Sequence, residues 1–451
     1  MLVKPEKMID RDLEWSILER FIGGGQRLAI VYGPRRVGKS FLLDAVCQAT
    51  DGRRYQAITG VAATQLADFG RQLGEWLGAG PLSIDGWADA LDRLARVELP
   101  FVALDELPYL TEVTAELPSL LQRYVDAGDG PALILSGSAL SVMADLVDAR
   151  APLYGRAAAI VVPVPLAGAD LAALWGTADP HDALWVDAAL GGLPGYRPLV
   201  DSPAGDRDAW MVEEVLAAGS PLLDAAEADL ANVSDLPALR GVYRAILAAI
   251  AAGDRSFSGI SRVAGLPSGA LSRPLATLQR AGLVERIRDP LRARRDRYEL
   301  ADPHLRLWLS IVAPNRSRLQ AGRAGEVWDA VRDTTWPSQV LGPRWEAVTR
   351  AHLARGGEER LGSLEVVGAT TVSDRSRRRS HEVDLVAMRG EKVVAIGEAK
   401  LRELNADDLE RLLHIRDLLG APEAAIVLAS ATAVDARHPD LIAIRPIDIY
   451  G

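Results

Sequence analysis

Residues 33–40 read Gly-Pro-Arg-Arg-Val-Gly-Lys-Ser, and this octapeptide constrains the fold more than any other stretch of the chain. An apolar run at 28–32 precedes it and a helical pattern follows, so the octapeptide joins a buried strand to a helix. Glycines in such a turn let backbone N–H groups face phosphates, and a helix N-terminus adds positive potential. In this pattern Lys39 reaches the β and γ phosphates and Ser40 ligates Mg²⁺. The stretch therefore predicts an α/β nucleotide site, with a plain strand–helix joint as the weaker alternative.

The residues expected to bind the nucleotide are Gly33, Pro34, Arg35, Arg36, Val37, Gly38, Lys39, Ser40 and Phe41. Further short apolar strands alternate with helical patterns, which is typical of a parallel α/β sheet. The predicted strands cover 28–33, 55–58, 100–104, 132–136 and 159–164.

Two carboxylates follow the apolar strand that ends at residue 104. We expect Asp105 to hold Mg²⁺ through water and Glu106 to orient or deprotonate the attacking water. An acidic pair also ends many ordinary strands. Its place downstream of a complete phosphate-binding loop favours the catalytic interpretation.

Polar residues after the later strands are candidates for contact with the γ-phosphate. Ser136 or Ser138 would sense it at the carboxyl edge of the sheet, unless they only form a tight turn. Arg156 would neutralise the charge of the γ-phosphate bound in its own or a neighbouring subunit, unless Arg156 only makes a surface ion pair. An arginine acting between subunits requires a homo-oligomer, and the sequence leaves that open.

Composition excludes several classes of protein. The 451 residues are 49% hydrophobic, which suits two to four domains with packed cores. The single cysteine, Cys47, excludes an internal disulfide, fits a reducing cytoplasm and is expected to be a packed thiol. No apolar run approaches the roughly 18 residues of a membrane span, and the start lacks a secretory leader, so we expect a cytoplasmic protein without a membrane partner. A net charge of −10 leaves room only for local basic patches.

The middle of the chain resembles a winged helix-turn-helix. Helices are predicted at 258–263 and 268–281, with a strand at 282–287 and its return at 298–300. Pro274 is awkward inside the second helix, which begins either at Ser268 or near Ser272. The presumed wing, 286–297, carries six arginines that would attract the phosphates of DNA or RNA. A structural spacer or a protein contact is the alternative. The arginines stand at 286, 288, 292, 294, 295 and 297.

Two strands near the C-terminus, 381–388 and 393–400, flank a turn and place Asp384 opposite Glu398 to within about one residue. Alternation puts Glu398 and Lys400 on one face. Two carboxylates and a lysine that converge at a sheet edge can bind Mg²⁺ or Mn²⁺ and stabilise an attacked phosphodiester. Glu346 could add a third carboxylate. The arrangement resembles the restriction-endonuclease-like PD-(D/E)xK fold, with Asp384, Glu398 and Lys400 in the motif positions. An inactive nuclease-like fold is the alternative.

The histidines give no comparable signal. None of the six shows zinc-ligand spacing, and His381, near Asp384, is expected to be a plain strand-start residue. The dense basic run 375–379 would either meet a nucleic-acid backbone or be a solvated loop.

These motifs together resemble the prokaryotic (archaeal-type) AAA+-related ATPase family. The resemblance rests on residues 10–14, 33–40, 104–106, 136–138, 153–156 and 191–196. It implies a P-loop NTPase parallel sheet with a helical lid, a winged helix and a C-terminal restriction-endonuclease-like α/β domain. The implied boundaries are 1–166 for the ATPase core, 167–236 for the lid, 237–315 for the winged helix and 316–451 for the nuclease-like domain.

The expected activity is ATP hydrolysis with Mg²⁺, coupled to nucleic-acid binding or processing. The alternative is a regulatory ATPase switch that controls partner binding and carries an inactive nuclease-like domain. Whether the chain also cleaves nucleic acid stays open. The residues expected to act in catalysis are Lys39, Glu106, Ser138 and Arg156, with Asp384, Glu398 and Lys400 in the nuclease-like domain; the metal ligands are expected to be Ser40, Asp105, Asp384, Glu398 and Glu346.

Overall fold

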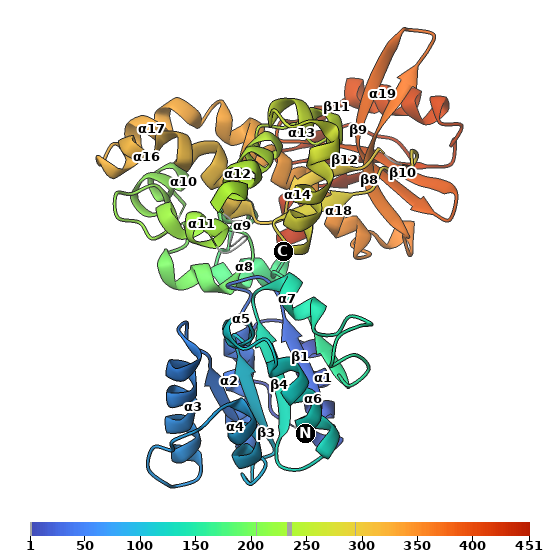
Figure 1. Cartoon of the computed structure of the whole chain (residues 1–451). Coiled ribbons are helices and arrows are strands. Elements are labelled where there is room, and N and C mark those ends of the chain that lie inside the picture. Colours follow the sequence, from blue (N-terminus) through green and yellow to red (C-terminus); the bar gives the residue numbers. More distant parts are fainter. Residues whose placement is uncertain (1, 204, 232–236, 294) are drawn as a thin grey trace. The chain divides into compact units, whose positions relative to one another are not determined.

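A computed structural model describes residues 2–203, 205–231, 237–293 and 295–451 of the chain. The chain folds into two compact units (Figure 1). The first consists of 1–165 with 193–195, and the second of 166–192 with 196–451. The expected lid boundary at residue 236 and the wing residue Arg294 lie outside the described residues.

A parallel five-stranded sheet forms the centre of the first unit, in the order β2-β3-β4-β1-β5 (Figure 1). Because β4 lies between β1 and β3, the phosphate loop and the acidic strand end belong to strands that are not neighbours. The strands are β1 (Leu28–Tyr32), β2 (Arg53–Gln56), β3 (Phe101–Asp105), β4 (Ala132–Gly137) and β5 (Ala159–Val161).

Alternating side chains of each central strand enter two separate cores. Leu28 and Ile30 of β1 pack with one set of helices, whereas Ala29 and Val31 pack with the other. Every central strand is therefore buried on both faces, as a parallel sheet requires. One core contains side chains of α3 (Ala62–Trp76), α4 (Trp87–Leu94), α5 (Pro108–Val113), α6 (Leu117–Ala127) and α7 (Leu140–Asp145); the other contains those of α1 (Asp12–Gly23) and α2 (Lys39–Thr50).

The fifth strand is shorter than its apolar pattern predicts. It ends at Val161 instead of residue 164, and Ile160, Val162 and Val164 are exposed. Proline lacks the N–H that a sheet ladder needs, so Pro163 cannot continue the pairing. The apolar run here covers an edge strand and the loop that follows it.

The second unit begins with short helices, as the Ala/Leu-rich sequence predicts. Gly192 packs closely against the backbone of Leu166, which lies much earlier in the chain, and its carbonyl accepts from the Leu166 N–H at 2.8 Å. A Cβ at Gly192 would lie 1.8 Å from the Leu166 oxygen, so only glycine fits. The helices are α8 (Ala169–Trp175), α9 (Pro180–Ala189), η1 (Pro194–Leu199), α10 (Arg207–Trp210), η2 (Met211–Val215) and α11 (Leu222–Ala231).

A winged helix follows and confirms the expected order of elements. Its second helix is continuous through Pro274 and begins at Ser268, with Leu271, Leu275 and Leu278 buried. The antiparallel strands of the wing pair Val284 with Leu300. The elements are α12 (Pro237–Ala251), α13 (Phe257–Val263), α14 (Ser268–Arg280), β6 (Val284–Ile287) and β7 (Arg297–Leu300).

Helices with a tryptophan-rich core lead on to the last domain. The rings of Trp185, Trp328 and Trp336 contact one another with centroids 5.0–6.0 Å apart. Such aromatic clusters bury much apolar area and fix the helices around them. The elements are α15 (Pro303–Leu307), η3 (Trp308–Val312), α16 (Ala313–Gln320), α17 (Ala324–Val331), η4 (Trp336–Leu341), α18 (Gly342–Ala354) and η5 (Glu359–Leu361).

The C-terminal domain is built on a mixed sheet in the order β14-β12-β10-β9-β8. Strands β8, β9 and β10 are antiparallel neighbours, whereas β10, β12 and β14 run parallel. Helix α19 packs Leu409, Leu412 and Ile415 into the core of this sheet. The elements are β8 (Val366–Asp374), β9 (Arg379–Arg389), β10 (Lys392–Lys400), β11 (Leu404–Asn405), α19 (Ala406–Leu418), β12 (Ala425–Ser430), β13 (Val434–Asp435), β14 (Leu441–Ile444) and α20 (Pro446–Tyr450).

Among the described residues, no helix combines the length and apolar character needed to cross a membrane.

Candidate functional site

The phosphate-binding loop places a buried ammonium at the start of α2. Gly38 caps the helix with φ 97°, a conformation that favours glycine. Lys39 is only 5% exposed, and its Nζ donates to the carbonyls of Gly33 at 2.9 Å and Pro34 at 3.0 Å. Burial lowers the pKa of Lys39, and the nearby Glu106 and Asp105 partly oppose this shift. The loop therefore concentrates positive charge where phosphates would bind.

Ser40 and Asp105 meet, although they come from α2 and β3. The Ser40 hydroxyl donates to Oδ2 of Asp105 at 2.7 Å, and Asp105 is fully buried at the end of its strand. A hydroxyl beside a carboxylate is an oxygen pair of the kind that Mg²⁺ selects. The residues present thus fit a magnesium–nucleotide complex.

Arg54 belongs to the same cluster, and sequence reasoning missed it. Its guanidinium donates to Oδ2 of Asp105 at 3.1 Å and to both oxygens of Asp44 at 2.6 and 3.0 Å. The only signal in the sequence is a pair of arginines in a four-residue strand beside β3. Arg54 therefore compensates the buried charge of Asp105.

Glu106 and Ser138 link the ends of β3 and β4. The backbone N–H and the hydroxyl of Ser138 donate to Oε2 of Glu106 at 3.3 and 3.0 Å. Glu106 has φ 54°, which is uncommon for a residue with a side chain and marks a backbone held by its surroundings. Ser136, the other serine considered, is fully buried, and its hydroxyl has no hydrogen-bond partner among the described residues.

The rest of the predicted loop residues have varied surroundings. Arg36 has φ 65°, and its carbonyl accepts from the N–H of Gly195 at 2.9 Å. Arg35 donates to the Tyr109 hydroxyl at 3.3 Å. Val37 is fully buried, whereas Phe41 is 51% exposed.

Arg156 forms a bidentate ion pair with Asp126 on α6, at 2.7 and 2.9 Å. This contact is the surface ion pair that the sequence left as the alternative to a γ-phosphate contact. Exposed pairs of this kind contribute little to stability, so the arginine remains available to a stronger anion.

The second predicted cluster forms in the C-terminal domain. Leu385 pairs with Gly397 across β9 and β10, so Asp384 and Glu398 occupy the next opposing positions. Lys400 Nζ lies 2.7 Å from Oδ2 of Asp384 and 3.3 Å from Oε1 of Glu398. Burial disfavours the charge on Lys400, but the adjacent Asp384 carboxylate raises its pKa overall.

A β-bulge lies beside Asp384. The register between β8 and β9 shifts between Gly368 and Thr370, so Asp384 and Leu385 together face one residue, Ala369. A bulge bends its strand and redirects a side chain, and bulges are frequent next to active sites. The period-two pattern of the sequence gives no sign of it.

Cations already contact the carboxylates of this cluster. Arg411 of α19 pairs with Glu398. Glu346, the expected third carboxylate, pairs with Arg255 at 2.7 Å and lies 3.9 Å from Arg350. A metal ion would therefore compete with Lys400 and Arg411 for Asp384 and Glu398.

Fewer arginines of the wing are available to contact nucleic acid than its sequence suggests. Arg297 pairs with Glu382 of β9 at 2.5 Å, Arg286 pairs with Asp296, and Arg292 donates to the Ser373 hydroxyl at 3.4 Å. The contacts of Arg297 and Arg292 dock the wing on β9 and β8 of the mixed sheet, whereas the Arg286 pair lies within the wing. The exposed basic residues of the helix-turn-helix are Arg262, Arg273 and Arg280.

The parallel sheet with its phosphate loop has the P-loop NTPase fold, and a winged helix and a mixed α/β domain follow it. Residues 239–295 match a model of the MarR family, and 308–412 match a model described as archaea bacterial proteins of unknown function. A search of curated proteins finds no match.

One solved structure supports the same assignment of fold. A Walker-type ATPase of Pyrococcus abyssi is similar over 68% of this chain and 97% of its own, with 22% identity and a TM-score of 0.51. The ORC2 protein of Aeropyrum pernix, solved as ADPNP–ADP complexes, is similar over 74% of this chain and 97% of its own, with 16% identity and a TM-score of 0.39.

Proposed function

We propose that the first unit binds and hydrolyses ATP with Mg²⁺. The observation that carries the proposal is the contact of Ser40 with Asp105 at 2.7 Å, beside the buried ammonium of Lys39. Bound Mg²⁺ would neutralise phosphate charge. Lys39 would exchange its carbonyl contacts for β- and γ-phosphate oxygens, which are stronger acceptors because they are charged.

Glu106 is the proposed base or orienting group for the attacking water. Ser138 holds one carboxylate oxygen of Glu106, so the other is the one available to accept a proton from water. Since Ser138 directly follows β4 and contacts Glu106, a γ-phosphate contact at Ser138 would be transmitted directly to Glu106. This pair would make hydrolysis sensitive to the bound nucleotide.

Calorimetric titration of the full chain with ATP and Mg²⁺ tests the proposal. Lys39→Ala should abolish tight binding, whereas Lys392→Ala, which changes an exposed lysine at the start of β10, should bind as the wild type does. Glu106→Gln should keep ATP affinity and lose at least about 10²-fold in turnover, the usual share of a general base. If Lys39→Ala bound ATP as tightly as the wild type, the proposed ATP site would be wrong.

We further propose that ATP turnover is coupled to DNA or RNA binding through the winged helix, with 167–236 acting as the helical lid. The exposed Arg273 and Arg280 of α14 support this role, because their charges can contact phosphates. The domain boundaries at 166, 236 and 315 stay predictions. So does the homo-oligomer that an arginine acting in trans requires, which light scattering with and without ATP would test.

Metal-dependent phosphodiester cleavage is a second candidate function, favoured by the convergence of Asp384, Glu398 and Lys400. Incubation with labelled DNA and RNA, Mg²⁺ or Mn²⁺, and ATP tests it. Cleavage lost in Asp384→Ala but kept in Glu391→Ala, an exposed turn residue, would support it. Intact nucleic acid alongside ATP turnover would favour a regulatory switch with an inactive nuclease-like domain.

A further inference from the structure

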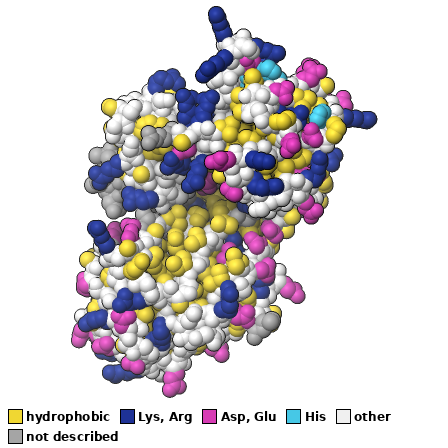
Figure 2. All heavy atoms as spheres, turned by 90° about the vertical axis from the view of Figure 1, so that its right-hand side faces the viewer, with side chains coloured by type: hydrophobic (Ala, Val, Ile, Leu, Met, Phe, Trp, Pro, Cys, Tyr) yellow, Lys and Arg dark blue, Asp and Glu magenta, His cyan; other side chains and the backbone are white. Residues whose placement is uncertain are grey.

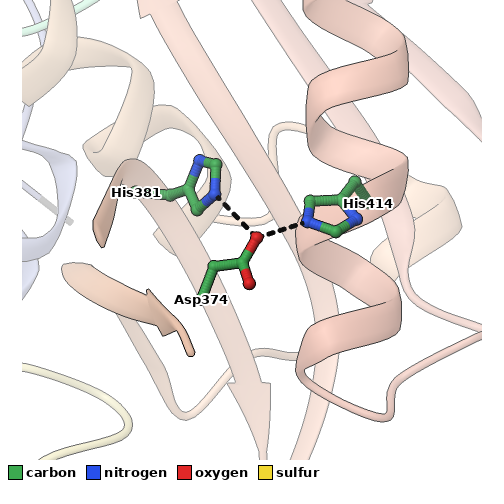
Figure 3. A group of neighbouring side chains, drawn as sticks. All are labelled: Asp374, His381 and His414. Carbon is green, nitrogen blue, oxygen red and sulfur yellow. Dashed lines mark hydrogen bonds and ion pairs between the residues drawn. The ribbon is translucent and has the colours of Figure 1, made fainter. Parts of the chain in front are cut away.

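In the C-terminal domain, the side chains of two histidines point to one carboxylate oxygen of Asp374 (Figure 3). Asp374 ends β8, His381 lies near the start of β9, and His414 projects from α19. The Nε2 atom of His414 is 2.9 Å from Oδ2 of Asp374, and the Nε2 atom of His381 is 3.8 Å from the same oxygen. One ligand atom from each residue lies within 4.8 Å of the other two.

These separations match those of metal ligands. Zn²⁺ binds imidazole nitrogen at about 2.0–2.1 Å and carboxylate oxygen at about 2.0–2.2 Å, usually in a tetrahedron. Two ligand atoms of such a tetrahedron lie about 3.4 Å apart. The distances of 2.9 and 3.8 Å fall on either side of this value, so small side-chain rotations would suffice.

The burial of these side chains is a second, independent indication of a metal site. His381 is 6% exposed and Asp374 is 1% exposed, yet the Nε2 atom of His381 is buried without a hydrogen bond among the described residues. A buried polar atom that is left unsatisfied destabilises the fold, because it has lost its hydrogen bonds to water. The Asp374 oxygen that His414 contacts lies 3.8 Å from this nitrogen. A bound cation would satisfy all three groups at once.

The other oxygen of Asp374 is already occupied. Its Oδ1 accepts from the Ser376 hydroxyl at 2.6 Å and from the Arg377 N–H at 3.0 Å. Contacts of this kind orient a ligating carboxylate. The guanidinium of Arg377 lies 3.8 Å from the remaining oxygen, Oδ2, so a metal ion would displace this exposed cation. The turn after β8 therefore presents Oδ2 to the two imidazoles.

We propose that Asp374, His381 and His414 form a binding site for a divalent transition-metal ion, with Zn²⁺ as the best match. Two imidazoles and one carboxylate suit zinc, whereas Mg²⁺ and Ca²⁺ prefer oxygen ligands alone. Three protein ligands leave the fourth position of a tetrahedron to water. Since His414 is only partly buried, that position can face solvent.

The site would fasten the β8–β9 hairpin to α19. Residues 375–379 at the hairpin tip are exposed and include four arginines, and Figure 2 shows basic side chains in dark blue at the projecting top of the view. Arg411, which contacts Glu398, lies one turn before His414 on α19. The metal would thus steady both the basic hairpin and the helix that borders the Asp384 cluster.

Zinc content of the purified full chain tests the proposal. After stripping with a chelator and dialysis against Zn²⁺, the wild type should keep a single equivalent per chain, and Co²⁺ should give the visible absorption of a tetrahedral site. His414→Gln and His381→Gln should lose this equivalent. Ser376→Ala changes only an exposed hydroxyl that orients Asp374, and it should weaken affinity by about 10-fold.

Two controls separate this site from its surroundings. His181→Ala, a histidine of α9, should keep the zinc equivalent, and so should Asp384→Asn, which alters only the other cluster. Circular dichroism should show that each variant is folded, and Zn²⁺ should raise the melting temperature of the wild type but not of His414→Gln. Equal zinc retention by the folded wild type and His414→Gln would overturn the proposal and leave the three residues as a hydrogen-bonded cluster.

Discussion

At the scale of single residues, the contact between Ser138 and Glu106 gives a direct prediction for the ATPase. Ser138→Ala removes a hydrogen bond worth about 1–1.5 kcal/mol, so turnover should fall by about tenfold while ATP affinity stays unchanged. Steady-state kinetics and calorimetry measure the two effects separately. Ser138→Thr keeps the hydroxyl and should retain most activity; equal losses in both variants would contradict a role for that hydrogen bond.

Cys47 should be a poor nucleophile in the folded chain. Desolvation in α2 raises the pKa of its thiol to about 11, so only about one molecule in a thousand carries the thiolate at pH 8. Ellman's reagent should therefore react much more slowly with the native protein than with protein unfolded in urea. The native rate should rise about tenfold per pH unit between pH 8 and 10. Equal native and unfolded rates would contradict this environment.

Residue identities were predictable only where a motif fixes their spacing. Lys39, Ser40, Asp105 and Glu106 follow from two short patterns, because backbone geometry ties such residues to the strand ends of a parallel sheet. Arg54 has no motif. Its partner Asp105 is nearby only because β2 pairs with β3, a long-range contact that the sequence does not state.

The histidines likewise could not be predicted as site residues, because no sequence motif connects them. Sequence spacing gave no reason to expect a zinc site, and His381 was interpreted as a plain strand-start residue. The structure brings it together with His414 because α19 packs on the sheet. Ligands from a hairpin and a later helix leave no compact spacing to find.

At the scale of elements, Pro274 makes α14 a weak point. The ring removes the N–H that would bond to the carbonyl of Ala270, and proline inside a helix costs about 3 kcal/mol relative to alanine. Pro274→Ala should therefore stabilise the second unit by up to that amount. Urea denaturation followed by circular dichroism measures it, with Ser272→Ala as a control of small effect. An unchanged midpoint would show that the helix already accommodates the proline.

The helix-turn-helix and its wing should differ in their contribution to nucleic-acid binding. Arg273→Ala on α14 should weaken DNA or RNA binding and lower the salt slope by about 1, because its charge is exposed. Arg297→Ala should change affinity little, since Glu382 already pairs with that guanidinium. Fluorescence anisotropy across a salt series measures both. The reverse order of effects would mean that the wing leaves the sheet to bind.

Elements were easier to predict than their partners. Hydrophobic periodicity locates the central strands of the first sheet and the helices of the winged domain, since burial on known faces controls both. It places Asp384 opposite Glu398 only to within about one residue, because a short turn fixes the register of a hairpin. A register shift between Val393 and Ala395 then moves the partner of Asp384 from Gly397 to Glu398. Periodicity does not reveal the bulge at Asp384 or the docking of the wing, because both depend on packing between segments far apart in sequence.

At the scale of the whole molecule, the division into two units predicts a selective effect of ligand. ATP with Mg²⁺ at 100 times its dissociation constant should stabilise the first unit by about 2.7 kcal/mol. Differential scanning calorimetry should show one transition that moves upward with nucleotide and another that does not. Lys39→Ala should abolish the shift, and a uniform shift of all heat absorption would indicate that the units unfold together.

Residues 193–195 belong to the first unit although the residues on both sides belong to the second, and this affects folding during synthesis. Gly195 donates the hydrogen bond that holds the Arg36 carbonyl, and a Cβ at Gly195 would lie 2.6 Å from the Arg36 Cβ. A nascent chain released only as far as Pro165 lacks this restraint. Ribosomes add about 5–20 residues per second, so the loop would wait on the order of ten seconds after its own translation before this bond can form.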